Sequence, residues 1–152
     1  MKRRIAGSAI RAAAIIFAIA AAKVLSQTGQ PLALFARIEG DAVIIAAGQK
    51  EFPRYKFGAD QKYPYFFPVN GPVSGRSVTT ESSQPFPHHR SLFFGCDRVN
   101  GGNYWQDSNA AGQIISEGPR IERALGEIVI FTDECVWRRP GADPVMRDRR
   151  RI

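Results

Sequence analysis

Short apolar runs, separated every few residues by Gly, Pro, Asn or Asp, follow one another along the chain after residue 30. Runs of this length that are rich in Val, Ile, Phe and Tyr and bounded by turn residues are typical of antiparallel β-strands. We therefore expect strands at residues 34–39, 42–47, 51–57, 65–69, 91–96, 103–106, 113–117, 121–125, 127–137 and 144–152. No sustained helical period follows residue 30, so helix should be nearly confined to the start of the chain.

The clearest expected strand covers residues 127–137. Alternation places one set of residues on one face, namely Val129, Phe131, Cys135 and Trp137, and a second set on the other, namely Ile128, Ile130, Thr132, Glu134 and Val136. Both faces are mostly apolar where the strand begins, which is typical of a central strand between two layers. The pattern as a whole predicts an all-β protein, an antiparallel β-sandwich or part of one.

Residues 1–26 have the layout of a signal peptide. A basic Met-Lys-Arg-Arg start is followed by an apolar run at residues 12–22 and by small residues suited to cleavage. The run holds 11 residues, whereas a membrane-spanning helix needs about 20, so an uncleaved anchor is the weaker alternative. We expect a helical signal peptide at residues 1–26, a β-sandwich domain at residues 27–152, and export to the periplasm or the medium.

The last expected strand runs into the chain end on three consecutive arginines, at residues 149–151. Because a domain rarely stops on an unpaired strand edge, we expect the chain to be the front part of a longer protein. The alternative is a final edge strand that its arginines protect from further pairing.

The 152 residues suffice for one domain, and their formal net charge of +7 would by itself suggest a nucleic-acid partner. The distribution argues against that partner. Residues 27–137 hold ten basic and twelve acidic residues, and the excess of basic residues lies at the two ends. We therefore expect no nucleic-acid partner, and no segment after the signal peptide reaches membrane-spanning length.

Cys96 and Cys135 are the two cysteines of the chain. In an oxidising compartment they could form one disulfide, but each also lies in an apolar run where a buried free thiol is common. Both alternatives stay open from the sequence.

The densest polar motif lies at residues 85–106 and contains both histidines of the chain, His88 and His89, followed by Arg90. Pro85 and Pro87 favour extended backbone before them, and in extended backbone His88 and Arg90 point one way and His89 the other. Two adjacent histidines then cannot hold one metal together without a kink, so we expect no metal site. One of them can act as an acid or a base.

Four further residues are expected to bind the ligand with this motif. Asp97 and Asn100 follow the expected strand and could reach back to orient a histidine and Arg90. Tyr65 lies in an aromatic cluster, and an aromatic ring near polar side chains suits a sugar, whose C–H face is apolar while its hydroxyls are polar. Trp105 closes the motif. The sequence has no metal-binding Cys/His cluster, phosphate-binding loop or serine nucleophile motif, and it leaves the cofactor unknown.

The motif residues also carry a resemblance. Residues 64–68 and 87–105, with Pro-His-His-Arg-Ser-Leu-Phe-Phe-Gly and Asp-x-Val-Asn-Gly, resemble a bacterial family of exported proteins labelled PmoA-like or methane oxygenase PmoA. The resemblance implies a longer β-sandwich protein. The label also implies a copper membrane monooxygenase, but such a subunit must span the bilayer repeatedly, and this chain has no span after its signal peptide.

We expect an exported protein that is active on a carbohydrate or another small molecule, with His88, His89 and Arg90 as catalytic residues. The alternatives are a sugar-binding or surface module without catalysis and an incomplete fragment without activity of its own. Paired carboxylates of a glycosidase cannot be assigned from the sequence.

Overall fold

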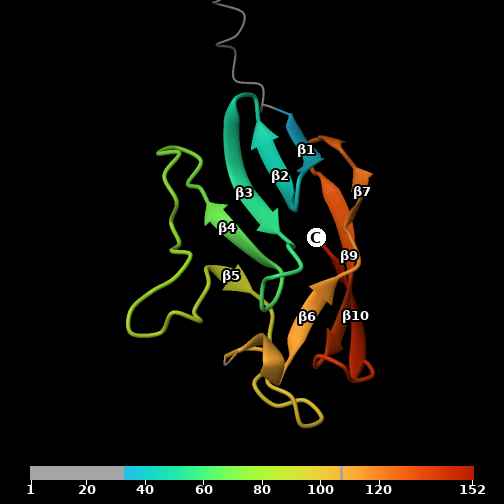
Figure 1. Ribbon diagram of the computed structural model, residues 1–152. Helices are drawn as coiled ribbons and strands as arrows, with labels where there is room; N and C mark the ends of the chain where they lie inside the picture. Colours follow the sequence, from blue (N-terminus) through green and yellow to red (C-terminus); the bar gives the residue numbers. More distant parts are fainter. Residues whose placement is uncertain (1–32, 107) are drawn as a thin grey trace, which may run out of the picture. The chain divides into compact units, whose positions relative to one another are not determined.

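The computed structural model describes residues 33–106 and 108–152, and these residues form antiparallel strands with hardly any helix (Figure 1). The strands are β1 (Leu34–Glu39), β2 (Ala42–Ala47), β3 (Lys50–Lys56), β4 (Tyr65–Val69), β5 (Leu92–Phe93), β6 (Gln113–Ser116), β7 (Arg120–Arg123), β8 (Leu125–Gly126), β9 (Ile130–Arg138) and β10 (Met146–Arg151). A single 3₁₀ turn, η1 (Asn109–Ala111), is the helical element of this part of the chain. The predicted all-β antiparallel class is confirmed, while the expected signal peptide at residues 1–26 lies outside the described residues.

The strands form two sheets. The first has the order β5-β4-β3-β2-β1-β8, and in the second β9 pairs with β10 on one side and with β6 and β7 on the other. β1 and β2 form a hairpin in which Glu39 lies opposite Ala42, so Gly40 and Asp41 make the predicted two-residue connection. Gly40 takes a φ of +58° there, a conformation that glycine adopts without steric cost.

The two sheets pack face to face, because aromatic residues of both meet in the interior (Figure 1). The Tyr55 ring on β3 lies 5.3 Å from the Phe131 ring on β9. One core cluster consists of Ala36, Val43, Ile45, Tyr55 and Phe131. A second consists of Tyr63, Tyr65, Tyr104, Ile114, Cys135 and Trp137.

β9 is the central strand of its sheet, as its two apolar faces predicted. Phe131, Thr132 and Asp133 are consecutive and all buried, which requires cover on both faces. Asp133 shares the inward face of Phe131, Cys135 and Trp137 and is only 1% exposed. A carboxyl group therefore lies in the interior of the sandwich.

Two strand predictions in the polar motif are wrong. The strand expected at residues 91–96 is reduced to Leu92–Phe93, and Ser91 before it has a φ of +27°, outside the β region. Residues 103–106 form no strand, because Asn103 Oδ1 accepts 3.0 Å hydrogen bonds from the backbone N–H groups of Trp105 and Gln106. Asparagine favours such local turns over strand pairing.

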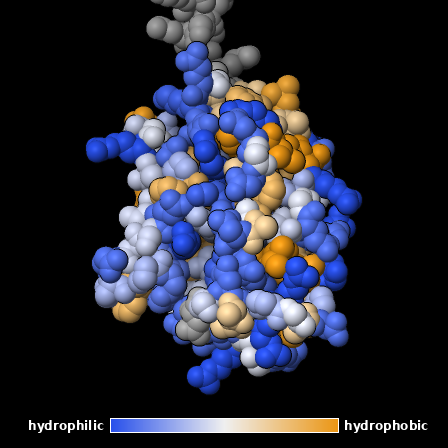
Figure 2. Space-filling model, in the orientation of Figure 1, coloured by the Kyte–Doolittle hydropathy of each residue, from blue (hydrophilic) through white to orange (hydrophobic). Residues whose placement is uncertain are grey.

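A long connection, residues 70–91, leads from β4 to β5 and carries the His-His-Arg motif near its end. On the face that Figure 2 shows, this connection at the left of the view is covered mostly by hydrophilic side chains, and hydrophobic ones gather near β1 and β7. Connections of more than about 15 residues in a folded domain often carry function. No helix among the described residues is long and apolar enough to cross a membrane.

Candidate functional site

His88 lies in a tight turn. The backbone N–H of His89 donates a 3.0 Å hydrogen bond to the carbonyl oxygen of Phe86, which closes the turn with Pro87 and His88 at its centre. The predicted extended conformation is therefore wrong at this point. The fixed φ of proline suits the second position of a β-turn, and this preference decides the local geometry.

The turn packs both imidazoles against the indole of Trp105. The His88 and His89 rings lie 4.6 Å apart and nearly perpendicular. The His89 ring is parallel to Trp105, at 5.9 Å and an interplanar angle of 6°, and it also stacks on Phe86. His88 meets the edge of Trp105 at 5.6 Å. These rings form one aromatic cluster, defined here by Phe86, His88, His89 and Trp105.

A buried tyrosine holds the backbone of the turn. The Tyr63 hydroxyl donates a 2.7 Å hydrogen bond to the backbone carbonyl oxygen of His88, and the Tyr63 ring stacks on Phe93 of β5. Burial raises the pKa of Tyr63 to about 12, so its hydroxyl keeps the proton that it donates. The position of His88 is thus held by a backbone contact in addition to the contacts of its imidazole.

Two pockets adjoin the aromatic cluster. The first, which we name the hydroxyl pocket, has a volume of about 660 Å³ and is lined mainly by Ser77, Thr79, Thr80, Ser83, His89 and Ser91. The second, the lysine pocket, has a volume of about 520 Å³ and is lined mainly by Lys56, Lys62, Tyr65, Glu81 and His88. Arg90 and Trp105 line both pockets. His88 lines the lysine pocket and His89 the hydroxyl pocket, although both rings also contact Trp105.

A charged pair stands in the lysine pocket. Glu81 Oε1 accepts a 2.6 Å hydrogen bond from Lys56 Nζ and another 2.6 Å bond from the Tyr65 hydroxyl. The bond from Lys56, followed by the bond from Tyr65, holds the pKa of Glu81 below its usual value. Glu81 is therefore ionised at neutral pH, and two donors already occupy one of its oxygens.

Backbone strain lies beside Arg90. Ser91 is one of two non-glycine residues with positive φ in the described part of the chain. Its N–H donates a 2.9 Å bond to the Thr80 carbonyl oxygen, and its hydroxyl donates a 2.7 Å bond to Thr79 Oγ1. Strained backbone that its surroundings hold in place is frequent where a ligand binds.

The structure brings five of the seven predicted site residues together, namely Tyr65, His88, His89, Arg90 and Trp105. The other two lie elsewhere. Asp97 lines a third pocket of about 710 Å³ with Arg98 and Arg139. Asn100 is exposed in a tight turn, with a φ of +46°. Neither residue lines the two pockets beside the histidines, and their role in orienting a histidine stays a prediction.

Two residues of the site were not identified from the sequence. Lys56 ends β3 and Glu81 lies in the long connection, 25 residues further along. No spacing rule joins a strand end to a loop position, so nothing in the sequence indicated this pair. Asp133 was not identified from the sequence either. An acid on the otherwise apolar face of residues 129–137 indicates a buried carboxyl group that needs hydrogen-bond partners.

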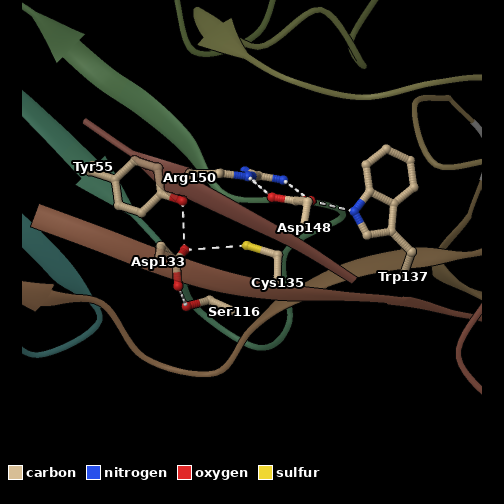
Figure 3. Close-up of polar contacts among 7 residues, drawn as sticks. All are labelled: Tyr55, Ser116, Asp133, Cys135, Trp137, Asp148 and Arg150. Atoms are coloured by element: carbon tan, nitrogen blue, oxygen red, sulfur yellow. Dashed lines mark hydrogen bonds and ion pairs between the residues drawn. The ribbon is translucent and has the colours of Figure 1, made fainter. Parts of the chain in front are cut away.

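The carboxyl group of Asp133 anchors a polar cluster between the sheets (Figure 3). Asp133 Oδ2 accepts a 2.6 Å bond from the Tyr55 hydroxyl, and Oδ1 accepts a 2.6 Å bond from Ser116 Oγ. The Cys135 thiol donates to Oδ2 at 3.4 Å. Nearby, Asp148 binds the Arg150 guanidinium through both oxygens, at 2.8 and 3.2 Å, and accepts a bond from Trp137 Nε1. Donors surround both carboxylates, so this cluster serves the packing of the sheets.

Neither cysteine is in a disulfide. Cys135 is buried and Cys96 is exposed, so the free-thiol alternative holds, while the expected burial of Cys96 is wrong. Burial raises the pKa of the Cys135 thiol. Across residues 33–106 and 108–152 no group of three or more His, Cys, Asp or Glu side chains is placed to hold a metal ion.

Comparison with known proteins gives one match. Residues 42–152 match a family described as "Family of unknown function (DUF6807)". The matched region includes both pockets and the whole aromatic cluster. No curated protein and no solved structure matches the chain.

Proposed function

We propose that this chain, which belongs to the family of unknown function DUF6807, binds a carbohydrate at the two pockets beside Trp105. The observation that carries the proposal is the position of the Trp105 ring. It lies parallel to His89 and lines two pockets at once.

A sugar needs two kinds of surface, and both meet here. Its C–H face packs on an aromatic ring, while its hydroxyl groups exchange hydrogen bonds with polar side chains. The hydroxyl pocket offers serine and threonine hydroxyls, and the lysine pocket offers charged groups. Each volume lies in the range of about 300–1,000 Å³ that is usual for small-molecule sites.

The indole N–H of Trp105 supports the same proposal. Trp105 Nε1 is buried and finds no hydrogen-bond partner among the described residues. Leaving such a donor unpaired costs about 1–3 kcal/mol. A ligand hydroxyl that reaches Nε1 would be a suitable acceptor for it.

The geometry favours binding over the expected acid–base catalysis. The ring contacts of both histidines are with each other and with Phe86 and Trp105. The nearby carboxylate, Glu81, already pairs with Lys56 and Tyr65. We assign His88 and His89 to ligand contact, and we further propose that the protein acts after export, as the pattern of residues 1–26 predicts.

The test is calorimetric titration of the full chain with a panel of neutral and acidic oligosaccharides. We expect at least one to bind, and Trp105→Ala to weaken that binding about tenfold or more. The matched control is Phe94→Ala, which removes an exposed ring that lines neither pocket. Absence of binding by every sugar, or equal loss in both variants, would contradict the proposal. Cleavage of a bound sugar would favour the enzyme alternative.

A further inference from the structure

Arg90 lies where the two pockets meet. Its Nη1 donates a long 3.5 Å hydrogen bond to the Tyr65 hydroxyl, and its Cζ lies 5.5 Å from the centre of the Tyr65 ring. A cation–π contact of this kind holds a guanidinium against a ring without using up its donors. A guanidinium has five N–H donors, so most of those of Arg90 are available to a ligand.

Glu81, an acid of the lysine pocket on which the charge of Arg90 acts, already has partners. Glu81 Oε1 is bound by Lys56 and by Tyr65, both at 2.6 Å. Among residues 33–106 and 108–152, none of the ion pairs includes Arg90. Arg90 is half-buried and forms no ion pair with Glu81, although its charge helps to hold the pKa of Glu81 low.

The hydroxyl pocket contains groups that solvate an anion. Apart from Arg90 and His89, its lining residues have no ionisable side chain, and most of them have hydroxyls. A single cation surrounded by neutral donors matches a single negative charge. The flat fork of a guanidinium also matches the plane of a carboxylate, which it binds through two parallel hydrogen bonds.

We propose that the ligand is an acidic sugar, a uronic acid residue whose carboxylate binds Arg90 from the hydroxyl pocket while its ring packs on Trp105. This proposal rests on the carbohydrate-binding function proposed above and specifies its ligand class. A phosphate or sulfate ester shares the oxyanion chemistry. The single unpaired arginine favours the carboxylate, because Lys56 is neutralised by Glu81.

The test compares sugars that differ only in charge. Trisaccharides of galacturonate, mannuronate and guluronate are titrated into the full chain beside their methyl esters, together with a sulfated galactose trisaccharide. We expect a uronate to bind about tenfold or more tightly than its ester, the gain typical of a charge-assisted hydrogen-bonded pair. Arg90→Gln should abolish the preference, so that uronate and ester bind with similar affinity.

Two further variants keep the result interpretable. Arg90→Lys retains the charge without the fork, so part of the preference should remain. Arg98→Gln removes an exposed arginine of the third pocket and should change nothing. Equal binding of uronate and ester, or tighter binding of the sulfated sugar, would overturn this inference and leave carbohydrate binding intact. Binding of no sugar at all would overturn both.

Discussion

The Tyr55 hydroxyl on β3 donates a 2.6 Å hydrogen bond to Oδ2 of Asp133 on β9, and this bond joins the two sheets through the interior (Figure 3). Burial, reinforced by the Asp133 carboxylate, raises the pKa of Tyr55 far above its usual value. The hydroxyl therefore remains a donor at every pH at which the protein is folded.

Tyr55→Phe removes this donor and leaves a buried carboxylate with fewer partners. We expect it to lower the free energy of unfolding by about 1.5–3 kcal/mol, as for a hydrogen bond to a charged group. Urea denaturation measures the change. Tyr63→Phe is the matched control, because Tyr63 donates to a neutral carbonyl oxygen and should cost only about 0.5–1.5 kcal/mol. Equal losses in the free energy of unfolding would mean that the bond from Tyr55 to Asp133 is no stronger than a hydrogen bond to a neutral carbonyl oxygen.

The two cysteines should differ in reactivity. Cys96 is exposed, whereas Cys135 is buried and its pKa is raised chiefly by burial. Because the thiolate is the reactive form, iodoacetamide should modify Cys96 in the folded protein and both thiols only after denaturation. Peptide mass spectrometry gives the sites. Modification of Cys135 under native conditions would contradict the buried cluster.

The ion pair in the lysine pocket should contribute to acid sensitivity. The bond from Lys56 holds the pKa of Glu81 low in the folded state, so the unfolded state takes up the proton first as the pH falls. The stabilisation by this pair is complete above the pKa that Glu81 has in the unfolded state. It is lost as the pH falls through the lower pKa that Glu81 has in the folded state.

Glu81→Gln should therefore flatten the fall in the free energy of unfolding between about pH 6 and about pH 3. The difference should stay below about 1 kcal/mol, because both side chains are partly exposed. Glu127→Gln, at an exposed position, should leave the pH profile unchanged. An identical profile for wild type and Glu81→Gln would show that the pair has no energetic role.

His88→Ala and His89→Ala should separate ligand binding from folding. His88 is held through its backbone carbonyl and His89 is exposed, so each substitution should change the free energy of unfolding by about 1 kcal/mol or less. Both should weaken sugar binding, since both rings pack on Trp105. If both variants unfold instead, the motif is structural and the proposed ligand contact is wrong.

The sequence predicted strands best where hydrophobic alternation and turns agreed. β1, β2 and β4 begin and end where the pattern indicated, because each is apolar or alternates apolar with polar residues and is bounded by turn residues. The prediction failed in the polar motif, where Asn103 and Pro87 turn the chain through local hydrogen bonds and a fixed φ.

The candidate site was predictable only in part. His88, His89 and Arg90 are neighbours in sequence and Trp105 lies nearby, so their clustering in the sequence was enough to select them as candidate site residues. Lys56 and Glu81 meet only because the long connection folds back over β3. Asp97 lines the third pocket, and its expected place beside the histidines depended on a strand that ends at Phe93.

The most direct measurement of carbohydrate binding uses the two tryptophans of the chain. Trp105 lines both pockets, whereas Trp137 is 1% exposed and its N–H is bound to Asp148. In ¹⁵N-labelled protein each gives one indole N–H signal, which Trp105→Phe assigns. On titration with trigalacturonate we predict that the Trp105 signal shifts in a saturable manner while the Trp137 signal stays in place. A titration in which neither signal moves, or in which Trp137 moves and Trp105 does not, would contradict binding of this sugar at the proposed site.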